Sequence, residues 1–238
     1  MTLNYAFLVL EEHPYGRQML QALLEAGFIP GAVIQEVSEV ADVEREKFLI
    51  RMTGQPVAAR INQLISGTGL PLYSVTNHND DTCLALLRAE APDLVVLGGT
   101  RILKPHIIEI PRLATLNAHP GLLPWLRGSA SVGWALYKDL PQGATVHFID
   151  AGIDTGDIIF REQLPVYRSD TYETLNGRVA HLAADLMARA LEAFAAGEVP
   201  RQPQSQDQGE TLRVIPDELL KIGVRRLAEG TYSHFVEV

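Results

Sequence analysis

Two polar side chains stand two residues apart in the segment LNAHPGLLP, and a carboxylate follows in the later segment HFIDAGIDTGD. The pair is Asn117 and His119, and the carboxylate is Asp154. In a strand, residues two apart point to the same side, so Asn117 and His119 are expected to face one site. An Asn amide can donate to a developing oxyanion, and a His can move a proton near neutral pH. With a carboxylate that orients the His, the set predicts acyl transfer by direct attack of the acceptor.

Each of these patterns is ordinary when taken singly. Asn-x-His before Pro is common in turns, and Asp-x-Gly is most often a plain hairpin turn. Motifs for other chemistries are absent from the sequence: it has no Gly-rich dinucleotide motif, P-loop or GxSxG elbow. No Cys or His spacing is typical of a metal site, so we predict none. His78 and its polar neighbours precede a predicted helix, where capping is the favoured role.

Apolar strand-like runs alternate with helical patterns along the chain. Strands are predicted near residues 6–10, 31–37, 71–75, 93–97, 113–116, 144–149 and 157–166, with a helix interrupted near residue 55 between the second and third. This order predicts an α/β fold with a Rossmann-like, mostly parallel twisted sheet and flanking helices. Ligands of such sheets bind beyond the carboxyl ends of the strands. Attention therefore falls on residues 98–103 and on those after Leu116.

The later part of the chain is organised differently. A strong amphipathic helix is predicted for residues 171–196, followed by a Pro- and Gln-rich loop at 200–209 and a last helix at 216–228. We assign residues 1–200 to one catalytic domain and residues 201–238 to a C-terminal loop and helical tail. The Gln-rich loop is interpreted as a plain linker. The sequence leaves open whether the tail packs on its own core or on a second subunit, so a homodimer is kept as one assembly.

Composition narrows the classes of partner. The chain has 238 residues, 47% of them hydrophobic, and a net charge of −9, which makes nucleic acid a poor partner because phosphates are bound mostly by Lys and Arg. The single cysteine, Cys83, excludes a disulfide within the chain. No apolar run approaches the roughly 20 residues of a membrane helix, and the first residues lack signal-peptide features. We expect a cytoplasmic protein with no membrane partner.

Taken together, the motifs resemble the folate-dependent formyltransferase family. Its signature is Asn-x-His-Pro-(Ser/Gly)-Leu-Leu-Pro, then a Gly and a helix with Trp or Ala, a Thr-Val-His strand and an Asp-x-Gly loop. Residues 117–124, 127–128, 134–136, 145–147 and 154–156 match these in order. Residues 92–97 and 101–103 are similar to the family's central strand and folate-binding segment. The resemblance is strong over residues 92–166 and rests on topology elsewhere.

The resemblance implies a formyltransferase-type fold and 10-formyltetrahydrofolate as the donor, with no metal. Asn117 would hold the formyl oxygen as it becomes an oxyanion, His119 would take part in proton transfer, and Asp154 would orient His119 and a water. The implied folate-binding residues are Arg101, Ile102, Leu103, Asp150, Ala151, Gly152 and Ile153. Plain core packing is an equal alternative for Ile102 and Leu103. His147 is expected to be structural and close to the site.

The sequence narrows the acceptor without fixing it. Residues 11–16 read EEHPYG, whereas relatives that formylate glycinamide ribonucleotide carry a Gly-rich phosphate loop there. Relatives that formylate initiator methionyl-tRNA have about 100 more residues after the catalytic domain, and only a short tail follows Ala196 here. We expect a small-molecule amine and favour a nucleotide-linked amino sugar. A 10-formyltetrahydrofolate hydrolase and a non-catalytic folate-binding module are the alternatives.

A helix predicted just after Ser129 offers one place for an anionic acceptor, because helix N-termini favour anions. Ser129 and Ser131 would both lie at its start. Capping of that helix by Ser129 is the favoured interpretation.

Overall fold

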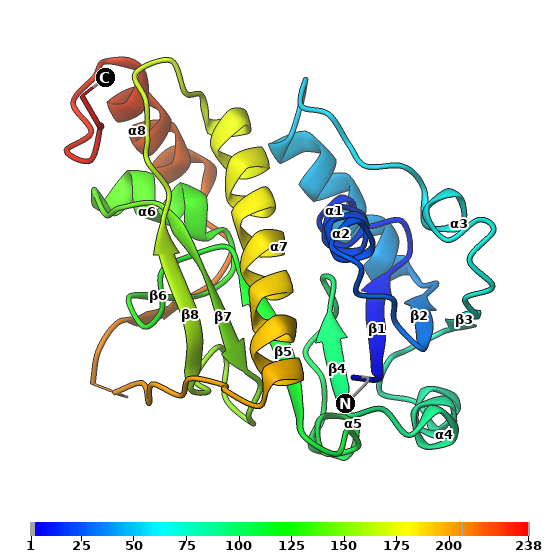
Figure 1. The fold of residues 1–238 in the computed structure, drawn as a ribbon. Helices are drawn as coiled ribbons and strands as arrows, with labels where there is room; N and C mark the ends of the chain where they lie inside the picture. The colour runs from blue at the N-terminus through cyan, green and yellow to red at the C-terminus, as the bar shows by residue number, and fades with distance from the viewer. Residues whose placement is uncertain (1–2, 206, 238) are drawn as a thin grey trace.

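A seven-stranded sheet forms the centre of the computed structural model, which describes residues 3–205 and 207–237 (Figure 1). Its order is β3-β2-β1-β4-β5-β7-β8. The strands are β1 (Tyr5–Leu10), β2 (Ala32–Glu36), β3 (Leu72–Val75), β4 (Leu94–Leu97), β5 (Ala114–His119), β7 (Gly143–Phe148) and β8 (Ile158–Gln163). The first five pair in parallel, and the pairs of β7 with β5 and with β8 are antiparallel. The predicted α/β fold with a mostly parallel sheet is confirmed.

Helices cover both faces of this sheet. One face packs against α1 (Pro14–Glu25), α3 (Ile61–Leu64) and α7 (Tyr172–Ala196), with α2 (Glu39–Arg51) beside them, and the other packs against α4 (Asp81–Glu90) and α5 (Pro105–Ile108). Successive residues of β1 alternate between the two: Phe7 and Val9 belong to the first core, Ala6 and Leu8 to the second. Burial on both faces explains the continuous apolar run of this strand.

The long helix α7 begins and ends where its sequence directs. The Thr171 hydroxyl accepts a hydrogen bond from the Thr174 N–H, as expected of an N-cap. Gly197 ends the helix with a φ of 75°, a left-handed conformation that glycine adopts without steric cost. Between these caps, an Ala- and Leu-rich face packs against the first core. The predicted boundaries, 171–196, agree with the structure to one residue.

The tail packs on its own chain. The strand β9 (Glu210–Leu212) pairs in parallel with β6 (Leu126–Gly128), and α8 (Asp217–Ala228) packs against α6 (Ser131–Lys138). A third apolar cluster joins Leu227 and Tyr232 of the tail to Val132 and Leu136 of α6. Strand β8 ends at Gln163, three residues before its predicted end at 166, and Val166 instead bridges to Phe235.

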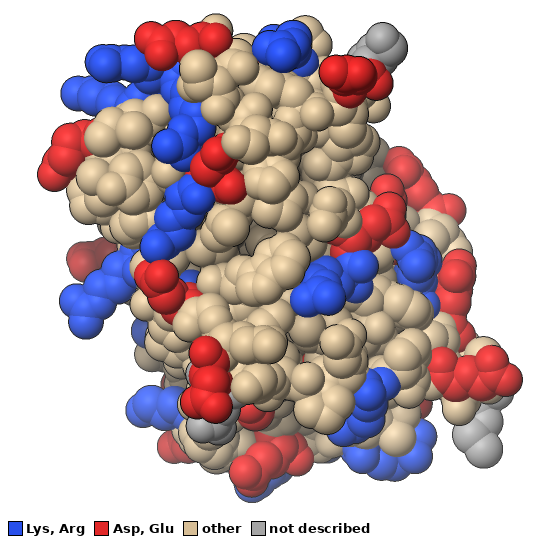
Figure 2. Space-filling view, turned by 90° about the vertical axis from the view of Figure 1, so that its left-hand side faces the viewer, with Lys and Arg blue, Asp and Glu red and all other residues tan. Residues whose placement is uncertain are grey.

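The surface of the face that carries β8, α6 and α8 shows charges of both signs scattered around a broad uncharged area (Figure 2). Among the described residues, no helix combines the length and the apolar character that crossing a bilayer requires.

Candidate active site

The candidate site lies where β5 ends. Register places Asn117 of β5 opposite His147 of β7, and Leu97, the last residue of β4, opposite Asn117 on the other side. Asn117 and His119 alternate with Leu116 and Ala118, which point into the first core. The two polar residues therefore share the opposite face, as their spacing predicts.

Asp154 comes from the loop between β7 and β8 and meets both histidines. Its Oδ2 lies 3.3 Å from His119 Nδ1, and its Oδ1 lies 3.5 Å from His147 Nε2. Asn117 Nδ2 lies 3.3 Å from the same His147 Nε2. We call Asn117, His119, His147 and Asp154, together with Ser131 at the start of α6, the polar cluster. The three residues singled out from the sequence are thus brought together, with His147 between Asn117 and Asp154.

His119 is held neutral but ready to accept a proton. Its Nε2 lies 2.8 Å from the Leu126 carbonyl oxygen, which can only accept, so Nε2 carries the hydrogen. Nδ1 is then the free base, and it faces Asp154. Burial lowers the pKa of His119, and the negative charge of Asp154 opposes that shift. The imidazolium, once formed, has an acceptor at each nitrogen.

Asp154 is a carboxylate under the same conditions. Burial alone would raise its pKa, but the positive charge of protonated His119 and His147 and the Gly128 N–H, which donates to Oδ2 at 2.7 Å, together lower it. Its φ of 53° is left-handed, a conformation that Asp tolerates better than most residues. Such backbone is typical of functional positions whose surroundings hold them in place.

Two glycines allow this close packing. A Cβ on Gly121 would lie 2.8 Å from His119 Nε2 and 2.7 Å from the Ser131 Cβ, and one on Gly156 would clash with the Phe148 carbonyl. A side chain at Gly121 would therefore displace Ser131 or His119, and one at Gly156 would displace backbone. The absence of a side chain at both positions lets the loops after β5 and β7 close around the polar cluster.

The Asn117 amide keeps one donor free. His147 donates from Nδ1 to the Phe148 carbonyl at 2.9 Å, so its Nε2 accepts one N–H of the Asn117 amide. The second N–H has no hydrogen-bond partner among the described residues, so it is available to a ligand oxygen. His147, expected only near the site, thus orients Asn117 directly.

The implied folate-binding residues fall into two segments that meet. Leu103 is 7% exposed and packs with Leu97 in the second core, and Ile149, just before the 150–153 loop, packs against the same core. Core packing is therefore right for Leu103, and it is wrong for Ile102, which is 77% exposed. Asp150, Ala151, Gly152 and Ile153 are all exposed.

Arg101 is engaged by a buried partner. Its guanidinium pairs with Glu36 at the end of β2, whose side chain is fully buried. Burial by itself would raise the pKa of Glu36, but hydrogen bonds from Arg101, Ser38 and the His78 N–H lower it. Glu36 therefore fixes Arg101 and His78 together. This pairing accounts for the buried His78 and leaves no sign of a catalytic role for it.

The structure also shows residues that sequence reasoning missed. The Tyr15 hydroxyl donates to the Ala118 carbonyl between Asn117 and His119, and Ser131 Oγ lies 3.1 Å from His119 Nε2. The capping role expected for Ser129 is wrong: the N-cap of α6 is Ala130, with no side-chain cap. The sequence pattern places Ser131 only at the start of a helix.

The Gln-rich loop is not a plain linker. Gln204 Nε2 donates to the carbonyls of Asp154 at 3.0 Å and Gly156 at 2.6 Å, and Arg127 donates to Gln204 Oε1. Gln204 therefore stabilises the loop that carries Asp154. No local sequence signal marks this contact, which joins residues 50 positions apart.

The acidic residues after β1 are neutralised locally. Glu11 lies 3.5 Å from Arg45, and Glu12 lies 3.5 Å from Arg17 and accepts from the Ile61 N–H. His13 follows, packed on Phe48 and against Gly99 after β4. This is the point where the sheet order reverses, between β1 and β4. No set of three or more potential metal ligands is found in the described ranges.

The formyl transferase family model matches residues 3–191, and the chain belongs to this family, whose members are enzymes that transfer formyl groups. A methionyl-tRNA formyltransferase of Pelotomaculum thermopropionicum is 33% identical over 187 residues, 78% of this chain and 57% of that protein. The chain spans about half the length of the curated relatives it matches.

Solved structures share the fold. A phosphoribosylglycinamide formyltransferase from Anaplasma phagocytophilum superposes with a TM-score of 0.64 at 21% identity, covering 90% of this chain and 99% of that one. The formyltransferase PseJ from Anoxybacillus kamchatkensis, in complex with a formamido sugar nucleotide and tetrahydrofolate, gives 0.53 at 21% identity, covering 88% and 86%.

Proposed function

We propose that this chain transfers the formyl group of 10-formyltetrahydrofolate to the amine of a small-molecule acceptor, with Asn117, His119 and Asp154 as its catalytic residues. The observation that carries the proposal is the meeting of these three side chains at the end of β5. Neutral His119 faces ionised Asp154 across 3.3 Å, beside an Asn amide with a free donor. Such a set moves a proton and stabilises an oxyanion without forming a covalent enzyme intermediate.

The proton path follows from the two pKa shifts. As the amine attacks the formyl carbon, a C–N bond forms and the carbonyl becomes an oxyanion, which the free N–H of Asn117 stabilises. His119 Nδ1 accepts the amine proton, and Asp154 stabilises the resulting imidazolium. The oxyanion then re-forms the carbonyl and the bond to the folate nitrogen breaks, and that nitrogen receives the proton that His119 had accepted. Atoms and charges balance with no further reactant.

The donor would be held beside the polar cluster by the two folate segments. Ile102 and Ile153 expose 77% and 45% of their surfaces there, and the exposed loop 150–153 offers backbone donors and acceptors. Apolar side chains and a few polar backbone groups are the usual lining for a planar heteroaromatic ligand. The relative crystallised with tetrahydrofolate supports this class of ligand.

The acceptor is proposed to be a nucleotide-linked amino sugar. Support comes from the structural relative solved with a formamido sugar nucleotide. The Gly-rich phosphate loop expected of ribonucleotide formylation is replaced by Glu11 and Glu12, which are held by arginines.

The test is calorimetric titration of the protein with a stable 10-formyltetrahydrofolate analogue, followed by a screen of amines with labelled donor. We expect saturable binding at one site and amine-dependent formyl transfer. Release of formate without an added amine would identify water as the acceptor. Binding without any turnover would leave a folate-binding module, and no binding would overturn the proposal.

A matched pair of variants localises the donor. Ile153→Asp places a charge where the pterin would lie and is expected to weaken analogue binding by about 1.4 kcal/mol or more, a factor of ten. Ile29→Asp alters another exposed isoleucine, before the amino end of β2, and serves as the control. Equal affinities for the two variants would remove the 150–153 loop from the donor site.

A further inference from the structure

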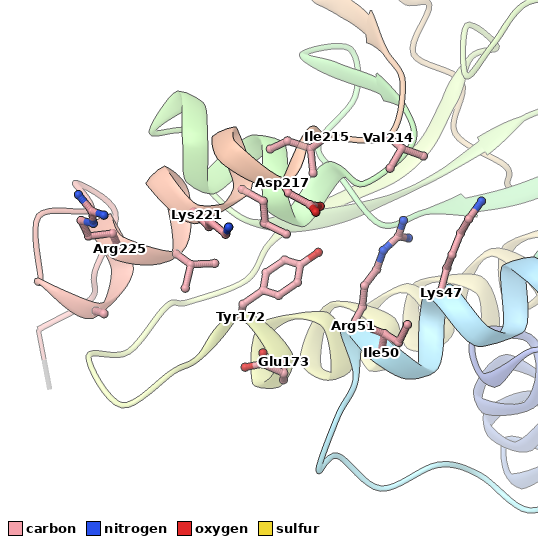
Figure 3. Close-up of a pocket in the computed structure, with 13 residues that line it drawn as sticks. Lys47, Ile50, Arg51, Tyr172, Glu173, Val214, Ile215, Asp217, Lys221 and Arg225 are labelled. Atoms are coloured by element: carbon pink, nitrogen blue, oxygen red, sulfur yellow. The ribbon is translucent and has the colours of Figure 1, made fainter.

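A second pocket, of about 660 Å³, lies outside the polar cluster between α2, the start of α7 and α8 (Figure 3). These three elements come from distant parts of the sequence. In Figure 1 they gather above the carboxyl ends of the parallel strands, the edge at which His119 lies. The side chains of Lys47 and Arg51 extend from α2 toward the segment that precedes α8.

Positive charge is concentrated in this pocket. Its lining contains four cationic residues (Lys47, Arg51, Lys221 and Arg225) and two acidic ones (Glu173 and Asp217), in a chain whose net charge is −9. Lys47 is paired with Glu44 at 2.8 Å. Across the described part of the chain, no carboxylate oxygen comes within 4.0 Å of the side-chain nitrogens of Arg51, Lys221 or Arg225. The pocket therefore holds three cations available to a ligand.

The rest of the lining is apolar. Ile50 and Val214 are 65% and 52% exposed, and Leu220 and Val224 lie between them and α6. Exposed aliphatic side chains beside unpaired cations favour a ligand that carries an anionic group on an apolar or planar body. The buried Tyr172 ring, whose hydroxyl points into the same space in Figure 3, adds an aromatic surface.

One packing contact and one electrostatic effect connect this pocket to the elements around the reaction centre. Ile215 packs against Gly133 of α6, where an added Cβ would lie 3.2 Å from its side chain, and α6 begins with Ser131 beside His119. On the other side, burial lowers the pKa of His13, and the charge of Arg51 adds to that shift. Gly133, which meets the pocket residue Ile215, thus lies within one turn of Ser131 on α6.

We propose that this pocket binds the phosphorylated part of the acceptor, which is attracted by Arg51 and Arg225 at the two ends of the lining and by Lys221 between them. The inference rests on the proposed function, since it names the part of the acceptor that the polar cluster does not hold. Three cations of the lining are available to a ligand, against two acidic residues, and a phosphoryl group carries about −1.5 to −2 at neutral pH. Arginine forks match phosphate oxygens in a bidentate geometry. The apolar lining would receive the organic body attached to the phosphate.

The test measures binding of inorganic pyrophosphate and of uridine diphosphate by calorimetry. Saturable binding of both is expected, with the nucleotide tighter because its ring covers the apolar lining. The Arg51→Gln/Arg225→Gln double variant should lower both affinities at least tenfold. Arg88→Gln, which removes an exposed cation from the last turn of α4, is the matched control and should change neither.

A variant that should strengthen binding controls for loss of binding through damage to the fold. Asp217→Asn removes a negative charge from the pocket and should tighten pyrophosphate binding severalfold. Unchanged or weaker binding in that variant, or equal binding in the double variant and Arg88→Gln, would overturn the proposal. Binding of the folate analogue should be the same in all four proteins. Failure of the anion arm with intact folate binding rejects this pocket alone, whereas loss of folate binding by the unaltered protein rejects the proposed function.

Discussion

The polar cluster and the pocket between α2, α7 and α8 differ in almost every physical respect. His119 is 2% exposed and its polar atoms have partners, whereas Ile50, Lys221 and Arg225 of the pocket are exposed, and the two cations lack carboxylate partners within 4.0 Å in the described residues. The cluster is suited to chemistry, because buried, preorganised donors act strongly at low dielectric. The pocket is suited to binding, since water-exposed cations can be covered by an anion at small cost.

This contrast teaches where catalysis and recognition should separate. Substitutions in the cluster are expected to lower kcat while leaving KM nearly unchanged, because their interactions form in the transition state. Substitutions in the pocket are expected to raise the KM of a phosphorylated acceptor with little effect on kcat. The variants below are ordered by the size of the expected effect.

His119→Ala is expected to cause the largest loss of kcat. Loss of the base that accepts the amine proton is expected to reduce kcat by about 100- to 10,000-fold, the usual range for general acid–base groups. Folate-analogue affinity and the melting temperature serve as controls for folding. Activity near that of the unaltered protein would remove His119 from the mechanism.

Asp154→Asn should reduce kcat over a comparable range, since it keeps the shape of the side chain but removes the charge that stabilises the imidazolium. It should also shift the pH profile. Burial lowers the His119 pKa and Asp154 raises it, so the acidic limb of kcat/KM should lie below pH about 6.5 in the unaltered protein and lower still in Asp154→Asn. If the acidic limb of the kcat/KM profile and the value of kcat are both unchanged in Asp154→Asn, Asp154 does not act on His119.

Asn117→Ala tests the oxyanion donor. Removal of such a donor typically costs about 3 kcal/mol, roughly a hundredfold in kcat. Rates measured at saturating donor, with the KM for folate as the control, check this. A loss smaller than threefold would reject the role.

Gln204→Ala is expected to have a smaller effect on kcat than the three substitutions above. Its amide donates to the Asp154 and Gly156 carbonyls, and neutral hydrogen bonds contribute about 1 kcal/mol each. A kcat loss within about tenfold is expected, with acceptor KM unchanged. A change in acceptor KM alone would place Gln204 with recognition instead.

The polar cluster could be predicted from the sequence to a large extent, whereas the pocket could not. Asn117, His119 and Asp154 lie in local motifs, and strand periodicity placed the first two on one face, so that part of the site followed from sequence patterns. The alternating apolar runs similarly predicted the parallel sheet. Gln204, Tyr15 and the pocket were hidden, because their contacts join residues far apart in the chain: Tyr15 meets Ala118 across 103 positions. Such pairings depend on tertiary packing, which leaves no local pattern.

The C-terminal segment illustrates the same limit. Its last helix was predicted from its spacing, yet the face that packs on α6 is set by Gly133 and Gly223, where added Cβ atoms would contact the opposing helix or the segment before it. In an isolated helix, glycine lowers the stability of the helix. Only the packed structure shows that it permits the close approach between α6 and α8.

The smallest effect concerns His13, a buried histidine whose pKa is influenced by Arg51 of the pocket. Burial, followed by the charges of Arg51 and Arg45 against that of Glu44, lowers its pKa to about 4, while in the unfolded chain it is about 6.5. Between these values the unfolded state binds more protons, so stability is lost as pH falls, by up to about 1.4 kcal/mol per pH unit. His78 and His119 have lowered pKa values as well, so the protein should keep part of this slope in His13→Asn. Urea unfolding at pH 7 and pH 5 should show a loss about 1–2 kcal/mol smaller for the variant than for the unaltered protein. Equal losses would mean that His13 is protonated in the folded state, and that its ring is more hydrated than its burial indicates.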